Sequence, residues 1–146
     1  MIIVIDANIL FSAVITPNGK IAGILGHPSL GAARITCHFL VQELNKHVSK
    51  IIRAAKRSEE SVMDDISGYL KYIQIYHETS IDLAHLKDAK HLTEGVDLYD
   101  MDYVALALQT GGYLWTGDKK LSDHLKKKGF SRVLNTSELC ELLEIG

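Results

Sequence analysis

Several residue types are scarce in this chain of 146 residues, and each scarcity excludes a class of protein. The two cysteines, Cys37 and Cys140, have no partner at the spacing of a zinc site, so both are expected to be core thiols. The seven histidines form no HxH or HExxH motif, which removes the usual signatures of zinc enzymes with histidine ligands.

Charge of one sign is not in excess, and long hydrophobic runs are missing. The 16 Lys and Arg residues are balanced by 18 Asp and Glu residues, which argues against a generally basic nucleic-acid binder. Any contact with nucleic acid must come from a local patch. Residues 2–5 form an apolar run that ends at Asp6, too short for a signal peptide or a membrane span. A cytoplasmic protein without a membrane segment is therefore expected.

Nucleotide-binding motifs and internal repeats are also missing. Gly19-Lys20 is not a P-loop, because Val14 stands where the first glycine belongs and Ile21 follows the lysine. No repeat, low-complexity segment or linker divides the chain. With 47% hydrophobic residues the chain can bury a sizeable core, so we expect a single domain over residues 1–146.

The sequence does contain short apolar runs that alternate with helical patterns. Residues 2–5 lead into Asp6, and residues 113–116 lead in the same manner into Gly117 and Asp118. Further strand candidates are residues 34–36, 73–76 and 132–134. The alternation predicts an α/β fold with a central parallel sheet of four to five strands. Ligands of such sheets bind outside the carboxyl ends of the strands, where Asp6 and Asp118 are expected.

Apolar residues at intervals of three and four predict the helices. A long helix over residues 39–57 is followed by a second, entered through Glu59 and Glu60, and together they form a helical hairpin. The apolar residues of the second helix are Val62, Ile66, Tyr69, Leu70 and Ile73. A short apolar helix over residues 103–109 stops at Gly111-Gly112. The remaining helices are expected over residues 118–128 and 137–144.

Asp6 follows four apolar residues, where an ionised carboxylate is costly unless a hydrogen bond, a cation or a metal compensates it. It is either a cap at the end of a strand or part of a functional site, and Asp6 alone does not decide between them. Asn8 is either a donor that orients the Asp6 carboxylate or the N-cap of the next helix, and we favour the cap.

Glu43 lies at the border of the apolar stripe of the long helix, beside Leu40 and Leu44. An acid at this border can point into a cleft. The alternative is a surface glutamate paired with Lys46 or His47, and for Glu43 considered alone this alternative is favoured.

Three carboxylates, Asp97, Asp100 and Asp102, precede the helix at residues 103–109. Each alone would be explained as an acid that is favoured at a helix N-terminus. Together with Asp6 and Asp118 from two strand ends, they would repel one another unless cations neutralise the site. The combination predicts a metal site built from oxygen ligands.

The order of these acids resembles the PIN-domain family over residues 1–135. The motifs that carry the resemblance are Asp6-Ala7-Asn8, Glu43 on the long helix, Asp100 seven residues before Ala107, and Thr116-Gly117-Asp118. The resemblance implies a Rossmann-like α/β/α sandwich with Mg²⁺ or Mn²⁺ and endoribonuclease activity. It also implies that the catalytic, metal-binding acids are Asp6, Glu43, Asp100 and Asp118. Thr116 is the family's hydroxyl beside the last acid, while Asp97 and Asp102 are extra acids with open roles.

The residue types suit hydrolysis of RNA phosphodiester bonds. Two divalent ions about 3.5 to 4 Å apart can activate water for in-line attack on phosphorus and relieve charge on the leaving oxygen. No protein nucleophile is required, which is consistent with the missing His-Ser and His-Cys pairs. VapC-type toxins with antitoxin partners are the largest group of the resembled family, so a toxin of a VapBC-type pair is one expectation. A homodimer is also expected.

Basic residues near the acids are candidates for contact with the RNA substrate. Lys46, Lys50, Arg53 and Arg57 recur at spacings of four, three and four and extend from Glu43. This stripe either contacts phosphates or is a solvated helix face. Lys119 and Lys120, directly after Asp118, have the same two interpretations.

Two other functions stay open. An aspartyl-phosphate phosphatase or phosphoacceptor domain also carries an aspartate at the first strand exit, although it usually has an acid two residues later, where Asn8 stands. The other is a non-catalytic PIN-like module that binds RNA or a protein.

Overall fold

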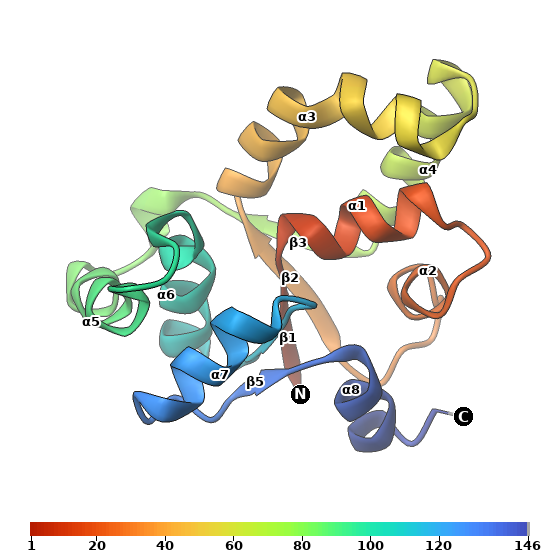
Figure 1. Cartoon of the computed structure of the whole chain (residues 1–146). Coiled ribbons are helices and arrows are strands. Elements are labelled where there is room, and N and C mark those ends of the chain that lie inside the picture. The colour runs from red at the N-terminus through yellow and green to blue at the C-terminus, as the bar shows by residue number, and fades with distance from the viewer. Residues whose placement is uncertain (146) are drawn as a thin grey trace.

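A five-stranded sheet forms the centre of the computed structural model, which describes residues 1–145 (Figure 1). All strand pairs are parallel. The strands are β1 Ile2–Ile5, β2 Ala33–Cys37, β3 Ile73–Tyr76, β4 Tyr113–Trp115 and β5 Val133–Leu134. The predicted α/β architecture with a central parallel sheet is confirmed.

The order of the strands creates a switch point in the sheet, and a ligand is expected to bind there. The order is β3-β2-β1-β4-β5, so the chain moves outward from β1 through β2 to β3 and then returns to the other side of β1. Open α/β sheets bind ligands at such a switch point, outside the carboxyl ends of the strands. Ile5 is aligned with Trp115 across β1 and β4. The next residues, Asp6 and Thr116, therefore leave the sheet side by side.

Helices occupy the connections between the strands. Within residues 1–145 the α-helices are α1 Ala7–Ile15, α2 Lys20–Leu25, α3 Phe39–Ala55, α4 Glu59–Leu70, α5 Leu83–Thr93, α6 Met101–Thr110, α7 Lys119–Lys127 and α8 Thr136–Leu143. Two short 3-10 helices are η1 Glu78–Ser80 and η2 Leu98–Asp100.

The helices form a layer on each face of the sheet. On one side α1 contacts α2, α3 and α4, while on the other side α6 packs on β1, β2 and β4 and contacts α5. Figure 1 shows this division, with α1 to α4 apart from α5, α6 and α7. Val4, Ile5, Leu114 and Trp115 are fully buried between the layers, as expected for central parallel strands. No helix in residues 1–145 is long and apolar enough to cross a membrane.

Most of the predicted elements are present, with some differences. Ile73 begins β3 instead of extending the second helix, because α4 ends at Leu70. Helices α2 and α5 are absent from the sequence-based prediction. The predicted stop after the short apolar helix is present. Gly111 caps the end of α6, directly after Thr110, and its φ of 73° lies in the left-handed region that favours glycine.

Candidate functional site

Asp6 leaves β1 at its carboxyl end and begins α1. Its Oδ1 accepts a 3.0 Å hydrogen bond from the N–H of Ile9 and thereby caps the helix. Asp6 is only 3% exposed. Burial raises its pKa to about 6; hydrogen bonds from Thr116 and Ile9 oppose this rise, and the charge of Asp118 adds to it. The residue is therefore both a helix cap and a buried acid beside a second acid.

β4 brings Thr116 and Asp118 to the same place. Thr116 is fully buried, and its Oγ1 accepts a 3.1 Å hydrogen bond from the N–H of Asp118. The Thr116 side chain also hydrogen-bonds Asp6. Asp118 is exposed and caps α7 by accepting a 3.1 Å bond from the N–H of Leu121. Thr116 thus links the acids that follow the two adjacent strands.

Glu43 comes from α3, the helix that follows β2. Its Oε2 lies 3.3 Å from Nε2 of His47, one turn later, so the surface pairing considered from the sequence does form. Glu43 is nevertheless only partly exposed, and it lines the same cavity as Asp6 and Asp100. The Glu43 side chain therefore contacts His47 and also lines the cavity.

The turn η2, between α5 and α6, contributes further acids. Asp97 begins this turn, and its Oδ1 accepts a 2.9 Å hydrogen bond from the N–H of Tyr99. Asp100 is half-buried and precedes α6 without a capping hydrogen bond from its side chain. Its carboxylate therefore stays available to the cavity.

These acids meet in one cavity of about 120 Å³, here named the acid pocket. Its lining residues are Asp6, Ala7, Asn8, Glu43, Asp97, Tyr99, Asp100 and Tyr103. The pKa of Asp100 is raised to about 7, chiefly by burial and additionally by the charges of neighbouring acids. Those neighbours, in order of effect, are Asp6, Asp97, Asp118 and Glu43. The charges of the other three acids of the predicted catalytic set therefore reach Asp100, although Asp118 follows the neighbouring strand and is not among the residues that line the pocket.

No lysine or arginine within residues 1–145 forms an ion pair with the acids of the acid pocket. Within residues 1–145, none of the ion pairs involves Asp6, Asp97, Asp100 or Asp118, and Glu43 pairs with His47. Mg²⁺ and Mn²⁺ favour such carboxylate donors, so the chemistry of this donor set fits a divalent cation. In the described part of the chain, no three acidic, histidine or cysteine side chains already stand in metal-binding geometry. A cation would have to draw the carboxylates together.

Two residues differ from the sequence-based expectations. Asn8 is not the N-cap of the first helix, because Asp6 takes that position, and Asn8 is instead an exposed residue that lines the acid pocket. Asp102 lies in the first turn of α6, where burial and the charge of Glu78 raise its pKa. The structure places Asp102 near Glu78 and not among the residues that line the acid pocket.

The predicted basic stripe is only partly present. Lys46, Lys50 and Arg53 are exposed along α3. Arg57 lies beyond the end of α3 and turns inward, where its Nη1 is 2.8 Å from Oδ2 of Asp65 and its Nη2 donates a 2.7 Å bond to the Val14 carbonyl. Arg57 therefore ties α1 to α4 and leaves the stripe with three members.

Two further lysines stand where the sequence places them. Lys119 and Lys120 are exposed and open α7 directly after Asp118. They lie at the same sheet edge as Asp6, because Asp118 follows the strand beside β1. Positive charge is therefore available close to the acids without forming an ion pair with them.

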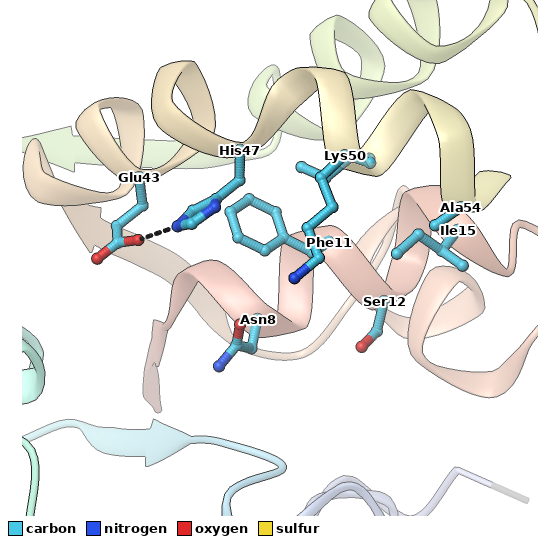
Figure 2. A pocket seen from close by; sticks show the side chains of 9 residues that line it. Asn8, Phe11, Ser12, Ile15, Glu43, His47, Lys50 and Ala54 are labelled. Atoms are coloured by element: carbon cyan, nitrogen blue, oxygen red, sulfur yellow. Dashed lines mark ion pairs between the residues drawn. The ribbon is translucent and has the colours of Figure 1, made fainter.

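A larger groove of about 380 Å³ runs between α1 and α3. Figure 2 shows side chains of both helices facing into it. The labelled residues are Asn8, Phe11, Ser12 and Ile15 from α1 and Glu43, His47, Lys50 and Ala54 from α3. Phe11 meets His47 edge to face, with ring centroids 6.0 Å apart. Since Asn8 and Glu43 line both cavities, this groove begins at the acid pocket.

Aromatic residues beside the acids were missed from the sequence. The Phe39 ring lies parallel to that of Tyr99 with centroids 6.5 Å apart, and it is tilted against Tyr103 at 5.9 Å. Tyr103 is buried, whereas Tyr99 is 71% exposed. The signal in the sequence is a tyrosine between Asp97 and Asp100, in a turn where no core position explains an aromatic residue.

Similar folds occur among solved structures. The crystal structure of VapBC2 from Rickettsia felis, bound to a DNA fragment from its promoter, matches with a TM-score of 0.70 and 16% identity. The match covers 92% of this chain and 98% of that one. The crystal structure of PAE2754 from Pyrobaculum aerophilum matches with a TM-score of 0.66 and 17% identity, over 99% of this chain and 90% of that one. Such identities show a shared fold.

Sequence comparison is more specific about the family. No curated protein matches the chain. A family model described as the PIN domain matches residues 4–136. This range includes Asp6, Glu43, Asp100 and Asp118. Because this match spans most of the sequence, the chain belongs to the PIN-domain family.

Proposed function

We propose that this chain is a metal-dependent endoribonuclease that hydrolyses RNA phosphodiester bonds, with residues 1–146 forming one PIN domain. PIN domains are generally nucleases, which supports the hydrolase class. The acid pocket is the observation that carries the proposal. Acids from separate parts of the chain raise the pKa of Asp100 there, and no ion pair in residues 1–145 supplies these acids with a lysine or arginine. Such a pocket is suited to binding cations that in turn bind a phosphate.

The residues that would hold a pair of Mg²⁺ or Mn²⁺ ions are Asp6, Glu43, Asp100 and Asp118. When bound, such ions supply activation of water for in-line attack and neutralise charge on the phosphate oxygens. The contribution of the chain is to position the acids. Asp6 and Asp118 are held by their capping hydrogen bonds, and Thr116 bonds to both. Asn8 and Asp97 also line the pocket, and Asp97 holds the backbone of Tyr99 there.

The pKa values of the pocket add a dependence on pH. Asp6 and Asp100, with pKa values raised to about 6 and about 7, hold protons that a cation must displace. Their ionised forms are the ones that bind metal. Cleavage should therefore rise as the pH increases through about 6 to 7.

Exposed basic residues on two elements would hold the RNA strand. Lys46, Lys50 and Arg53 lie along α3 from Glu43, and Lys119 and Lys120 open α7. Contacts between these residues and phosphates would contribute affinity that falls as the salt concentration rises. Asp102 and Arg57 take no part in this proposal, since Asp102 lies near Glu78 and Arg57 pairs with Asp65.

We further propose that the chain is the toxin of a VapBC-type pair and that it forms a homodimer. The solved Rickettsia felis complex, whose fold this chain shares, contains VapB and VapC with DNA. The groove between α1 and α3 offers a partner an apolar surface that starts at Glu43. A short neighbouring gene for a DNA-binding protein, whose product binds this chain and stops cleavage, would support the pair. A product that binds without stopping cleavage would count against it.

The nuclease proposal is tested with purified protein and labelled single-stranded RNA. Cleavage should occur with Mn²⁺ or Mg²⁺ and stop with EDTA. Asp6→Asn and Asp118→Asn should each reduce the rate by at least about 100-fold while the fold survives, because they remove metal-binding charge. Asp123→Asn, on the exposed side of α7, is the matched control. Cleavage that is insensitive to EDTA, or Asp variants that cut as fast as the parent, would refute the proposal.

The phosphoacceptor alternative is weakened by the position of Asp6. Its Oδ1 is committed to the Ile9 N–H, and the residue is 3% exposed. Asn8, in place of the second acid of that class, points into the pocket as a neutral group. Trapping of a phosphate analogue on Asp6 would restore this alternative. A non-catalytic module would bind metal and RNA in the same assays and show no cleavage with any RNA.

A further inference from the structure

A second cavity of about 300 Å³, here named the aromatic pocket, opens directly beside the acid pocket. Glu43, Asp97 and Tyr99 line both cavities. The residues that line the aromatic pocket but not the acid pocket are Phe39, Gln42, Lys46 and His47. A strand that presents a phosphate to the acids therefore passes this second cavity. Its lining differs from that of the acid pocket because it adds basic side chains, Lys46 and His47, to aromatic rings and an amide.

Tyr99 supplies a fixed aromatic surface at this place. The residue is 71% exposed, which is unusual for a large aromatic side chain without a ligand. Its backbone is held by the 2.9 Å hydrogen bond to Asp97, and its ring is parallel to that of Phe39 within 3°. Tyr99 is thus a supported platform with most of its surface open to solvent.

Gln42 and Lys46 stand one turn apart on α3 and are both exposed. An amide side chain can accept and donate hydrogen bonds at the edge of a nucleobase. An ammonium group can contact the adjoining phosphate. Aromatic stacking combined with a basic groove is the usual way in which proteins hold single-stranded nucleic acid.

From this geometry we propose that the aromatic pocket binds one unpaired base of the substrate strand. The base stacks on Tyr99, Gln42 hydrogen-bonds its edge, and Lys46 contacts a neighbouring phosphate. The inference rests on the proposed ribonuclease function and assigns the site that reads the nucleotide beside the acid pocket. A paired base cannot offer its face to Tyr99, so the pocket selects single-stranded or looped RNA.

Binding of a short fluorescently labelled single-stranded RNA, measured by anisotropy in EDTA, tests the subsite without cleavage. Tyr99→Ala should weaken binding roughly 5- to 150-fold, the range found for loss of one base-stacking residue. Tyr99→Phe keeps the ring and should bind like the parent. Leu98→Ala is the matched control, because Leu98 is a 55% exposed apolar neighbour in the same turn. Stacking carries no charge, so Tyr99→Ala should leave the salt dependence unchanged, whereas Lys46→Ala should flatten it.

A series of RNAs with one abasic position each identifies the bound base. The parent should lose affinity strongly at one position, and Tyr99→Ala should be insensitive to removal of that same base, because both changes remove one contact. Tyr99→Ala that binds like the parent, or equal losses at every position in both proteins, would overturn the subsite. RNA bound without dependence on Tyr99 but cleaved with Mn²⁺ removes the subsite alone. Binding that depends on Tyr99 without any cleavage removes the nuclease function and leaves an RNA-binding site.

Discussion

Replacement of Asp6 by asparagine should stabilise the metal-free protein at neutral and alkaline pH. The pKa of Asp6 is raised from 3.8 to about 6 in the folded chain, chiefly by burial. The folded state therefore holds this proton more tightly than the unfolded state. The stability that this preference contributes is fully present below about pH 4 and is lost as the pH rises through about 6. Asparagine does not ionise and avoids the loss.

The size of the effect follows from the same pKa values. The rise from 3.8 to about 6 corresponds to at most about 3 kcal/mol of unfolding free energy at pH 8, at about 1.4 kcal/mol for each pH unit. Asparagine retains an oxygen that can accept the capping bond from the Ile9 N–H, so the cap itself should cost little. For a chain of 146 residues, about 3 kcal/mol raises the melting temperature by up to roughly 10 °C.

Thermal unfolding followed by circular dichroism in EDTA, at pH 4 and at pH 8, measures this difference. The gap between Asp6→Asn and the parent should favour the variant at pH 8 and shrink toward pH 4. Asp123→Asn removes an exposed carboxylate of α7 and should change stability by less than about 0.5 kcal/mol at either pH. A variant that is less stable than the parent by the same amount at both pH values would refute the electrostatic reasoning.

Three other expectations follow from the site. Millimolar Mn²⁺ should raise the melting temperature of the parent, because a ligand that binds only the folded state stabilises it. Asp6→Asn should lose most of that rise. Equal melting temperatures of the parent with and without metal would contradict a metal site in the acid pocket. Arg57→Ala should lower the unfolding free energy by about 1–3 kcal/mol in urea titration, since it leaves the Val14 carbonyl unpartnered, whereas Arg53→Ala should change it little. Thr116→Val removes a bond that lowers the pKa of Asp6, so the acid limb of the pH–rate profile should move to higher pH, and an unmoved limb would exclude that role.

The centre of the sheet could be predicted from the sequence because β1 and β4 are apolar runs with a clear end. The helices were less readable where burial is weak. In α5 the buried residues are Ala89 and Thr93, so no broad apolar stripe marks this helix. The six-residue α2 is too short for its apolar residues to show a helical period. Ile73 was ambiguous because it continues the spacing of α4 and also opens the strand that follows.

Asp6 and Asp118 could be placed near the edge of the sheet from the sequence because each closely follows an apolar strand. What spacing cannot supply is the direction of a side chain. Asp102 and Asp100 are two residues apart, yet one lies near Glu78 and the other in the acid pocket, since residues at this separation point to different faces of a helix. Arg57 fits the basic period of α3, but the helix ends at Ala55 and the chain turns away before it. These outcomes depend on tertiary packing.

Exceptions to ordinary burial rules distinguish the candidate site from the rest of the molecule. Arg34 is a buried charge, but its Nη1 donates hydrogen bonds to the carbonyls of Ile24 and Leu25 and its guanidinium lies over the Tyr72 ring, so the fold itself supplies it with partners. Within residues 1–145, no lysine or arginine forms an ion pair with the acids around Asp6. The ring of Tyr99 is exposed to solvent beside these acids. Groups without partners in the fold are expected at functional sites, where a bound molecule supplies the missing contacts. The acids and the ring lie at the switch point where the strand order reverses, so one bound ligand can contact both.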